Sequence, residues 1–184
     1  MRCGLWSPAV NKWFQMGALL IVAAAAGFAG YHFNRAHLDS PATKIAARKL
    51  LLLPLVDLNG KTQTLSREQA KILVVNFWAT WCPPCREEIP VLKKIQRKYA
   101  SNNVEIVGIA LDNAVKVQEY SSEMSIDYGL LIGGLEVLAT SKDLGNRAEV
   151  LPFTVILDRA RQAAFTHAGA LSEAALDAAL VPLL

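Results

Sequence analysis

Two cysteines, Cys82 and Cys85, are separated by Pro83 and Pro84. They directly follow an apolar run, residues 72–78, and directly precede a stretch with helical spacing. A Cys-x-x-Cys pair at the first turn of a helix suits thiol–disulfide exchange, because unpaired N–H groups and the positive helix end stabilise a thiolate on the first cysteine. The second cysteine lies one turn further on, where it can close a disulfide and release a bound partner. The spacing therefore predicts a redox pair.

A zinc half-site and a passive structural disulfide are the alternatives for this pair. A closed zinc site needs four Cys or His ligands, usually as two pairs. The other candidates, Cys3, His32, His37 and His167, form no second pair at ligand spacing. A disulfide that closes so short a loop adds little stability. These considerations favour redox chemistry and predict no metal site.

The residues around the pair resemble a known family. Residues 74–86, Val-Val-Asn-Phe-Trp-Ala-Thr-Trp-Cys-Pro-Pro-Cys-Arg, resemble the active-site strand and helix of thioredoxin-fold proteins. Residues 85–90, Cys-Arg-Glu-Glu-Ile-Pro, resemble the TlpA/ResA-like branch of that fold. The resemblance runs from about residue 50 to residue 184. It implies a thioredoxin fold with a central mixed sheet flanked by helices, and protein thiol-disulfide oxidoreductase activity without a metal or organic cofactor.

The two cysteines are expected to play different roles. Cys82 precedes the helix and is expected to be the more exposed, so it is assigned as the attacking cysteine. Cys85, one turn inside, is assigned as the resolving cysteine. Trp81 is expected to be a partly exposed platform beside Cys82 and, with Pro83 and Pro84, to contact the client protein.

Leu151 and Pro152 form a second candidate contact with the client. Pro152 matches the family proline that precedes a strand facing the redox pair, and the resemblance implies a cis peptide bond after Leu151. Such a bond would turn the backbone at Leu151 so that it pairs with an extended client chain. The alternative is an ordinary proline between a loop and a strand.

Glu88 is the candidate for proton transfer. Thioredoxin has a buried Asp at the position of Asn76, and an amide cannot move protons for the inner cysteine. Glu88 matches a glutamate of the TlpA/ResA-like branch near the pair, and the inner thiol must deprotonate before it attacks a mixed disulfide. The alternative is an acid stabilised by the helix dipole, which is our interpretation of Glu87.

The charges near the pair favour a disulfide reductase. A strong oxidant needs an exceptionally stabilised thiolate. No His lies between the cysteines, the nearest cation is Arg86 beyond the pair, and Glu87 and Glu88 add negative charge. The helix end alone is expected to stabilise the thiolate moderately.

The family resemblance also implies partners. These are disulfide-bearing client proteins and a membrane electron donor of the DsbD or CcdA type, with cytochrome c maturation as one family occupation; we expect a monomer. One competing function is a peroxiredoxin-like peroxide reductase, but that family requires Pro-x-x-x-Thr-x-x-Cys and Ala79 stands where the Thr is needed. Another is a non-catalytic thioredoxin-fold binding or chaperone module, against which the intact pair argues.

The elements that must position the pair follow from the apolar pattern. Residues 72–78 are too uniformly apolar for a half-exposed strand, which indicates a central strand buried on both faces. A helix over about 84–99 would bury Ile89, Leu92, Ile95 and Tyr99. Strands and helices alternate through the rest of the domain, which predicts an α/β sandwich around a mixed sheet. The expected strands are 50–58, 104–111, 128–132, 153–157 and 162–167, and the expected helices are 113–124, 135–144 and one capped by Ser172. The extra helix and strand between Asp112 and Pro152 resemble the central insertion of TlpA-type proteins.

The N-terminal segment is predicted to be a transmembrane anchor. No permanently charged residue lies between Lys12 and Arg35, and residues 13–33 are long enough for a helix of about 20 residues to span a bilayer. A signal peptide, uncleaved or cleaved within the small residues 23–30, is the alternative. The expected organisation is a tail (1–12), an anchor (13–33), a tether (34–49) and a thioredoxin-like domain (50–184).

The orientation and charge of the chain bear on its location. A short tail before one apolar helix usually stays in the cytoplasm, so the domain is expected to face the periplasm from the bacterial inner membrane. The net charge is only +3, without a dense basic run. Nothing in the sequence therefore suggests a nucleic-acid partner.

Overall fold

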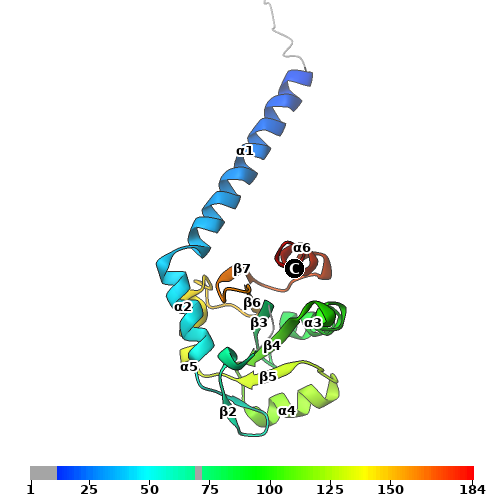
Figure 1. Ribbon diagram of the computed structural model, residues 1–184. Coiled ribbons are helices and arrows are strands. Elements are labelled where there is room, and N and C mark those ends of the chain that lie inside the picture. The colour runs from blue at the N-terminus through cyan, green and yellow to red at the C-terminus, as the bar shows by residue number, and fades with distance from the viewer. Residues whose placement is uncertain (1–11, 69–71) are drawn as a thin grey trace, which may run out of the picture. The chain divides into compact units, whose positions relative to one another are not determined.

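A computed structural model describes residues 12–68 and 72–184, without the side chains of residues 12–14, 31–35 and 37. The chain divides into two units, Met1–His37 and Leu38–Leu184 (Figure 1). The predicted N-terminal tail lies outside the described residues except for Lys12.

The first unit contains most of α1 (Lys12–Leu38), a helix of 27 residues. This helix includes the segment predicted to be an anchor. Within the described part of the chain, no helix is both long enough and apolar enough to span a bilayer. The membrane anchor therefore stays a prediction.

Within its described residues, the second unit is built on one mixed sheet of seven strands. The strands, in chain order, are β1 (Leu55–Asp57), β2 (Thr62–Gln63), β3 (Ile72–Trp78), β4 (Val104–Ala110), β5 (Gly129–Ile132), β6 (Phe153–Leu157) and β7 (Ala163–Ala168). In space their order is β2-β1-β5-β4-β3-β6-β7. β3 runs parallel to β4 and antiparallel to β6, so the mixed sheet expected from the sequence is confirmed.

The central strand β3 is buried along its whole length, as its apolar composition predicted. Alternate residues face opposite sides of the sheet. Ile72, Val74 and Trp78 belong to one core, and Leu73, Val75 and Phe77 belong to the other. Asn76, on the face of the first three, is the one polar residue of the strand and is buried as well.

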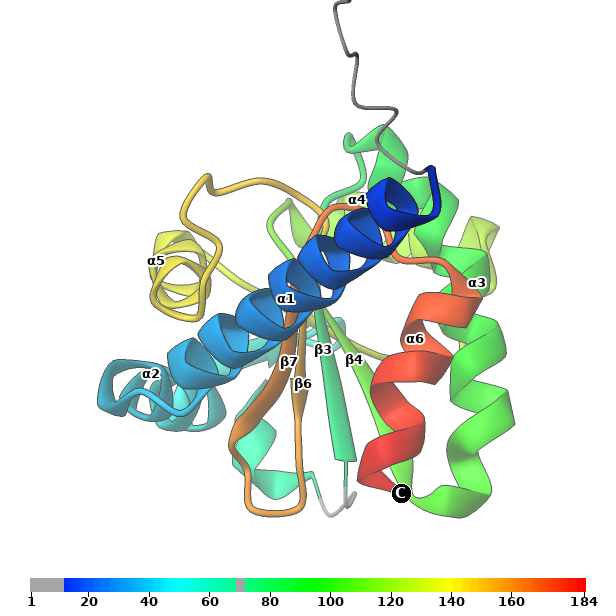
Figure 2. The same ribbon diagram turned by 90° about the horizontal axis from the view of Figure 1, so that it is seen from above.

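Helices cover both faces of this sheet (Figure 2). They are α2 (Pro41–Leu52), α3 (Pro83–Tyr99), α4 (Ala114–Glu123), α5 (Leu135–Asp143) and α6 (Glu173–Leu180), with short 3-10 helices η1 (Leu65–Arg67), η2 (Ala100–Asn102) and η3 (Val181–Leu183). α3 and α6 lie on one face, and α2 and α5 lie on the other. The predicted buried side of α3 is confirmed, because Ile89, Leu92, Ile95 and Tyr99 all belong to the core.

The structure differs from two expectations, namely that residues 34–49 form a tether and that the first strand begins at residue 50. Residues 41–52 form α2, which buries Ala46, Ala47 and Leu50 in the second unit, and the first strand begins only at Leu55. Ser40 caps this helix by accepting the N–H of Thr43 at 3.2 Å. Pro41 is the first residue of this helix, a position that tolerates proline because its missing N–H has no helical partner there.

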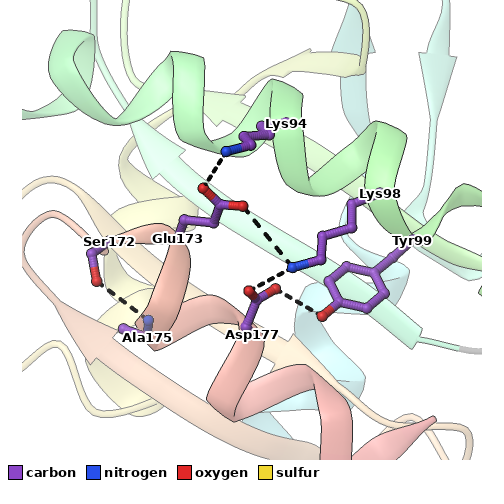
Figure 3. Close-up of polar contacts among 7 residues, drawn as sticks. All are labelled: Lys94, Lys98, Tyr99, Ser172, Glu173, Ala175 and Asp177. Carbon is purple, nitrogen blue, oxygen red and sulfur yellow. Dashed lines mark hydrogen bonds and ion pairs between the residues drawn. The ribbon is translucent and has the colours of Figure 1, made fainter.

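A cluster of charged side chains joins α6 to α3 at the surface (Figure 3). Lys94 Nζ lies 2.6 Å from Glu173 Oε2, and Lys98 Nζ lies 2.6 Å from Asp177 Oδ2. Tyr99 donates its hydroxyl proton to Asp177 Oδ1 at 2.7 Å. We call these five residues the surface ion cluster.

Ser172 begins α6 as predicted. Its side chain accepts the N–H of Ala175 at 3.3 Å (Figure 3). The residue before this cap, Leu171, is buried against the same core as α3. The start of α6 is thus held close to the helix that carries the cysteines.

Candidate active site

Cys82 and Cys85 lie at the start of α3 and are joined by a disulfide, with their Cα atoms 5.3 Å apart. Cys82 is the N-cap residue, and its Sγ accepts the N–H of Cys85 at 3.3 Å. Pro83 and Pro84 occupy the first helical positions. A sulfur at this place lies at the positive end of the helix, among N–H groups without helical partners. The geometry therefore suits a thiolate on Cys82.

Cys82 is the more exposed of the two cysteines, as expected, although both are buried. Cys82 is 4% exposed and Cys85 is 1% exposed. Both belong to the core on the α3 side of the sheet. Cys82 nevertheless lines a surface cavity of about 650 Å3.

This cavity brings together most of the predicted client contacts. Its lining residues are Trp81, Cys82, Pro83, Pro84, Leu111, Gly133, Gly134, Leu135, Leu138, Glu149, Val150 and Leu151. Pro152 is buried next to Leu151, and the peptide bond between them is cis, as the resemblance implied. The redox pair and the proline loop thus border the same apolar cavity, with Cys82 in its wall.

The loop before Cys82 is fixed to the end of β4. Leu111 donates its N–H to Trp78 O at 2.8 Å, and Thr80 donates its N–H to Asp112 Oδ2 at 3.3 Å. The Thr80 hydroxyl donates to the same carboxylate. Trp78 is fully buried and Trp81 is 66% exposed, as predicted for both. The loop therefore holds Trp81 in solvent beside Cys82.

Glu88 is buried one turn beyond Cys85 and carries two hydrogen bonds. It is 2% exposed. Its Oε2 accepts the side-chain N–H of Asn76 at 3.0 Å, and its Oε1 accepts the N–H of Leu171 at 2.8 Å. Burial raises the pKa of Glu88 above its ordinary value of 4.5, and the two hydrogen bonds only partly oppose this. Glu88 is therefore not an exposed acid at a helix start, unlike Glu87, whose side chain is exposed.

Asn76 and Thr154 complete this buried group, which with Glu88 we call the buried carboxylate site. Asn76 pairs in register with Thr154 of β6. Its amide also donates to Thr154 Oγ1 at 3.0 Å. Sequence reasoning missed Thr154 and the N–H of Leu171. Thr154 was detectable as the one polar residue in the apolar run 153–157, whereas no sequence pattern marks a backbone N–H.

Arg86, the cation nearest the pair in sequence, is held against α4. Its Nε donates to Tyr120 OH at 3.2 Å, and its guanidinium lies 5.1 Å from the centre of the Tyr120 ring. Tyr128, also on this side of the sheet, has a buried hydroxyl without a hydrogen-bond partner among the described residues. Burial, and then the charge of Glu88, raise the pKa of Tyr128, so it stays neutral.

The remaining candidate ligand in this unit, His167, lies apart from the cysteines on β7. It is half-buried, and its ring stacks on Phe165 with centroids 6.2 Å apart, which indicates a packing role. Among the described residues, no group of three or more His, Cys, Asp or Glu is placed to hold a metal ion. The chemistry that the site offers is therefore that of the sulfur pair and the buried carboxylate below it.

The chain is similar to proteins of known family. The Redoxin family matches residues 37–180, well over half of the chain. The thiol-disulfide oxidoreductase ResA of Halalkalibacterium halodurans is 26% identical over 163 residues, which cover 88% of this chain and 88% of that protein. ResA of Bacillus cereus is 32% identical over 128 residues, which cover 66% of this chain and 72% of that protein.

A solved structure agrees with these relatives. The crystal structure of a thiol:disulfide interchange protein of the thioredoxin family from Chlorobium tepidum has a TM-score of 0.62 and 27% identity, over 71% of this chain and 93% of that chain. The thioredoxin fold expected from the active-site motif is confirmed, and so is oxidoreductase activity, in preference to a non-catalytic binding module. The chain belongs to the Redoxin family, as a thiol-disulfide oxidoreductase similar to ResA.

Proposed function

We propose that the protein reduces disulfides in client proteins, with Cys82 as the attacking cysteine and Cys85 as the resolving cysteine. The observation that carries this assignment is the position of the two sulfurs. Cys82 lines the cavity at the N-cap of α3, whereas Cys85 lies one turn inside, on the side of Glu88. A client disulfide approaching through the cavity meets Cys82 first.

The reaction consists of two exchanges. The thiolate of Cys82 attacks one sulfur of the client disulfide, forms a mixed disulfide and expels the other client sulfur as a thiolate. The thiolate of Cys85 then attacks Cys82 Sγ, closes the Cys82–Cys85 disulfide and releases the second client sulfur. Two electrons pass from the pair to the client, and the two protons lost by the pair balance those taken up by the client thiolates.

Glu88 is proposed to take the proton of Cys85 before the second exchange. An ordinary carboxylate is too weak a base for a thiol, whose usual pKa is about 8.5. Burial raises the pKa of Glu88 and so narrows this difference. Proton transfer between Cys85 and Glu88 is more efficient when their pKa values are closer. Asn76 and the N–H of Leu171 hold the carboxylate in place.

The client is proposed to bind as an extended chain against Trp81, Pro83, Pro84 and Leu151, with Pro152 fixing the loop behind them. No hydrogen bond within the described residues uses the backbone of Leu151. Its N–H and C=O are therefore available to pair with a client strand.

The direction of transfer is proposed to be reduction of the client. Arg86 is hydrogen-bonded to Tyr120, and Glu88 is buried below the pair. Among the described residues, little besides the N-terminal end of α3 therefore stabilises a thiolate on Cys82. Equilibration with glutathione buffers tests this. A potential at or below about −200 mV is expected, and one near −120 mV would assign an oxidase instead.

Residues 13–33 are proposed to anchor the domain to the bacterial inner membrane, with electrons supplied by a dithiol donor of the DsbD or CcdA type. The support is the absence of permanent charge between Lys12 and Arg35. An anchored protein resists carbonate extraction, and protease added to spheroplasts digests its domain. Soluble protein beginning near residue 30 would show that the segment is cleaved.

Trapping of mixed disulfides tests the order of attack. Cys85→Ser removes the resolving thiol, so adducts between Cys82 and clients should accumulate on non-reducing gels of cell extracts. Cys82→Ser, the matched control, should form none. Adducts formed through Cys85 in the Cys82→Ser protein would reverse the assignment.

A further inference from the structure

One wall of the cavity is formed by an apolar helix start that the redox chemistry does not require. Leu135 is the first residue of α5 and is 84% exposed, the highest value among the large apolar side chains described. Trp81 and Val150, which are 66% and 41% exposed, line the same cavity. Single exposed apolar residues are ordinary, but a group of them in one concave surface marks a binding site.

The backbone at the start of α5 is held in place by close packing and a hydrogen bond, so Leu135 has a fixed position at the surface. Gly133 lies against Val137 and Ile109 so closely that a Cβ on it would meet their side chains at 2.6 and 2.9 Å. Val137 is fully buried in the core. Gly134 donates its N–H to Glu136 Oε1 at 3.2 Å. With this turn fixed against β4, Leu135 and the half-buried Leu138 face the cavity.

The chemistry of the cavity indicates what it holds. Within the described lining, Glu149 is the one charged side chain, and it is paired with Lys142 at 2.6 Å. The lining is otherwise apolar apart from two glycines and Cys82. A volume of about 650 Å3 has room for several side chains of an extended peptide.

We propose that this wall, Leu135 with Leu138 and Val150, selects clients that carry a large aliphatic or aromatic residue two positions from the attacked cysteine. The inference rests on the proposed function, because the client must lie across Cys82 and Leu151 for its neighbouring residues to reach α5. In an extended chain, residues two apart point to the same side. The side chain two positions from the attacked cysteine therefore points, like that cysteine, into the cavity that Cys82 and Leu135 both line.

Two disulfide-bonded peptides test the proposal. They are identical except that the residues two positions from each cysteine are Leu in one and Ser in the other. The wild-type protein, reduced beforehand, should reduce the Leu peptide with a kcat/KM roughly tenfold higher, the size expected when one apolar contact is lost. Leu135→Ser should lower this preference to about twofold or less.

Val115→Ser is the matched control. Val115 is 65% exposed near the start of α4 and does not line the cavity, so this variant should keep the full preference. Both substitutions are at exposed helix starts, where serine is well tolerated, and the far-ultraviolet circular dichroism of both variants should match that of the wild type.

The outcomes separate this inference from the proposed function. Equal rates for the two peptides in the wild type would overturn the selection while leaving disulfide reduction intact. Failure to reduce either peptide, with both thiols free, would overturn both. A wild-type dimer in sedimentation that Leu135→Ser dissociates would assign the wall to a second copy of the chain and also overturn the selection.

Discussion

Two regions join α3 to α6, and each contains a carboxylate. In the buried carboxylate site, Glu88 of α3 accepts the N–H of Leu171, just before α6. In the surface ion cluster, Asp177 of α6 accepts hydrogen bonds from Lys98 and Tyr99 of α3. Both connect the same helices, yet their environments give the two acids opposite properties.

The pKa values differ because of what surrounds each acid. The hydrogen bonds from Lys98 and then Tyr99 lower the pKa of Asp177 below its usual value. Glu88 also has two donors, but both are uncharged, and desolvation raises its pKa. Both sites connect α3 to α6, but only the buried one, whose donors are uncharged, raises the pKa of its carboxylate, as the proposed proton transfer from Cys85 requires.

Glu88→Gln should have the largest effect. It keeps the size of the side chain and removes the ionisable group, so the second exchange should slow by about 10²-fold, the lower end of what general acid–base catalysis contributes. Rapid-quench measurement of mixed-disulfide release between pH 5 and 9 reports this step.

Glu87→Gln is the matched control for that measurement. Glu87 precedes Glu88 on α3 but is exposed, so its rates and pH profile should stay those of the wild type. If the two variants behave alike, Glu88 is only an acid near a helix start, and the contrast with Asp177 has no functional meaning.

Asn76→Ala tests what a polar partner of Glu88 contributes. It removes the donor to Glu88 Oε2 and leaves that buried oxygen unpaired, which should lower the free energy of unfolding by about 1–3 kcal/mol. Because this hydrogen bond lowers the pKa of Glu88, its loss should move the corresponding limb of the pH–rate profile to higher pH.

Thr154→Val separates these two effects. It removes the other acceptor of the Asn76 amide but keeps the bond from Asn76 to Glu88. Stability should fall, and the pH–rate profile should stay in place. A profile that shifts equally in both variants would show that packing alone sets the environment of Glu88.

The pH dependence of stability tests the direction of the Glu88 shift. Because its pKa in the folded protein is above the ordinary 4.5, the folded state binds this proton more tightly than the unfolded state does. The stabilising contribution is complete below pH 4.5 and is lost as pH rises through the folded-state pKa. Urea unfolding of the wild type and Glu88→Gln should therefore show the wild type losing stability relative to the variant over this range. A gain would contradict the raised pKa.

These properties were only partly visible in the sequence. The bounds of the strand 72–78 were predicted correctly. These seven residues are too uniformly apolar for a half-exposed strand, so the strand had to be central in the sheet. α3 was predicted for a similar reason, since its apolar residues recur at helical spacing. α2 was missed because most of its buried residues are small, and because Leu50 and Leu51, which end it, continue into the apolar run that predicted a strand from residue 50.

The residues of the candidate site also divide into those that the sequence predicted and those that it did not. Cys82, Cys85 and Glu88 are close in sequence, so a motif places them together. Asn76 and Leu171 contact Glu88, and Thr154 contacts Asn76, only because β3, β6 and the start of α6 converge beneath α3. The wall formed by Leu135 and Leu138 likewise depends on where α5 packs. Contacts that the fold makes between distant segments leave no local pattern to detect.

The smallest effect is expected in the surface ion cluster, for Asp177→Asn. The variant loses the charge that pairs with Lys98 but keeps an oxygen that can accept the hydroxyl proton of Tyr99. Exposed ion pairs contribute little, so the melting temperature should fall by no more than about 2 °C. This difference should shrink in about 1 M NaCl, where charges are screened within roughly 3 Å. The rates of disulfide exchange should be those of the wild type, because Glu88 keeps its own contact with Leu171. A loss as large as that of Asn76→Ala would show that the two regions act as one, since the surface pairs would then be holding the buried carboxylate in place.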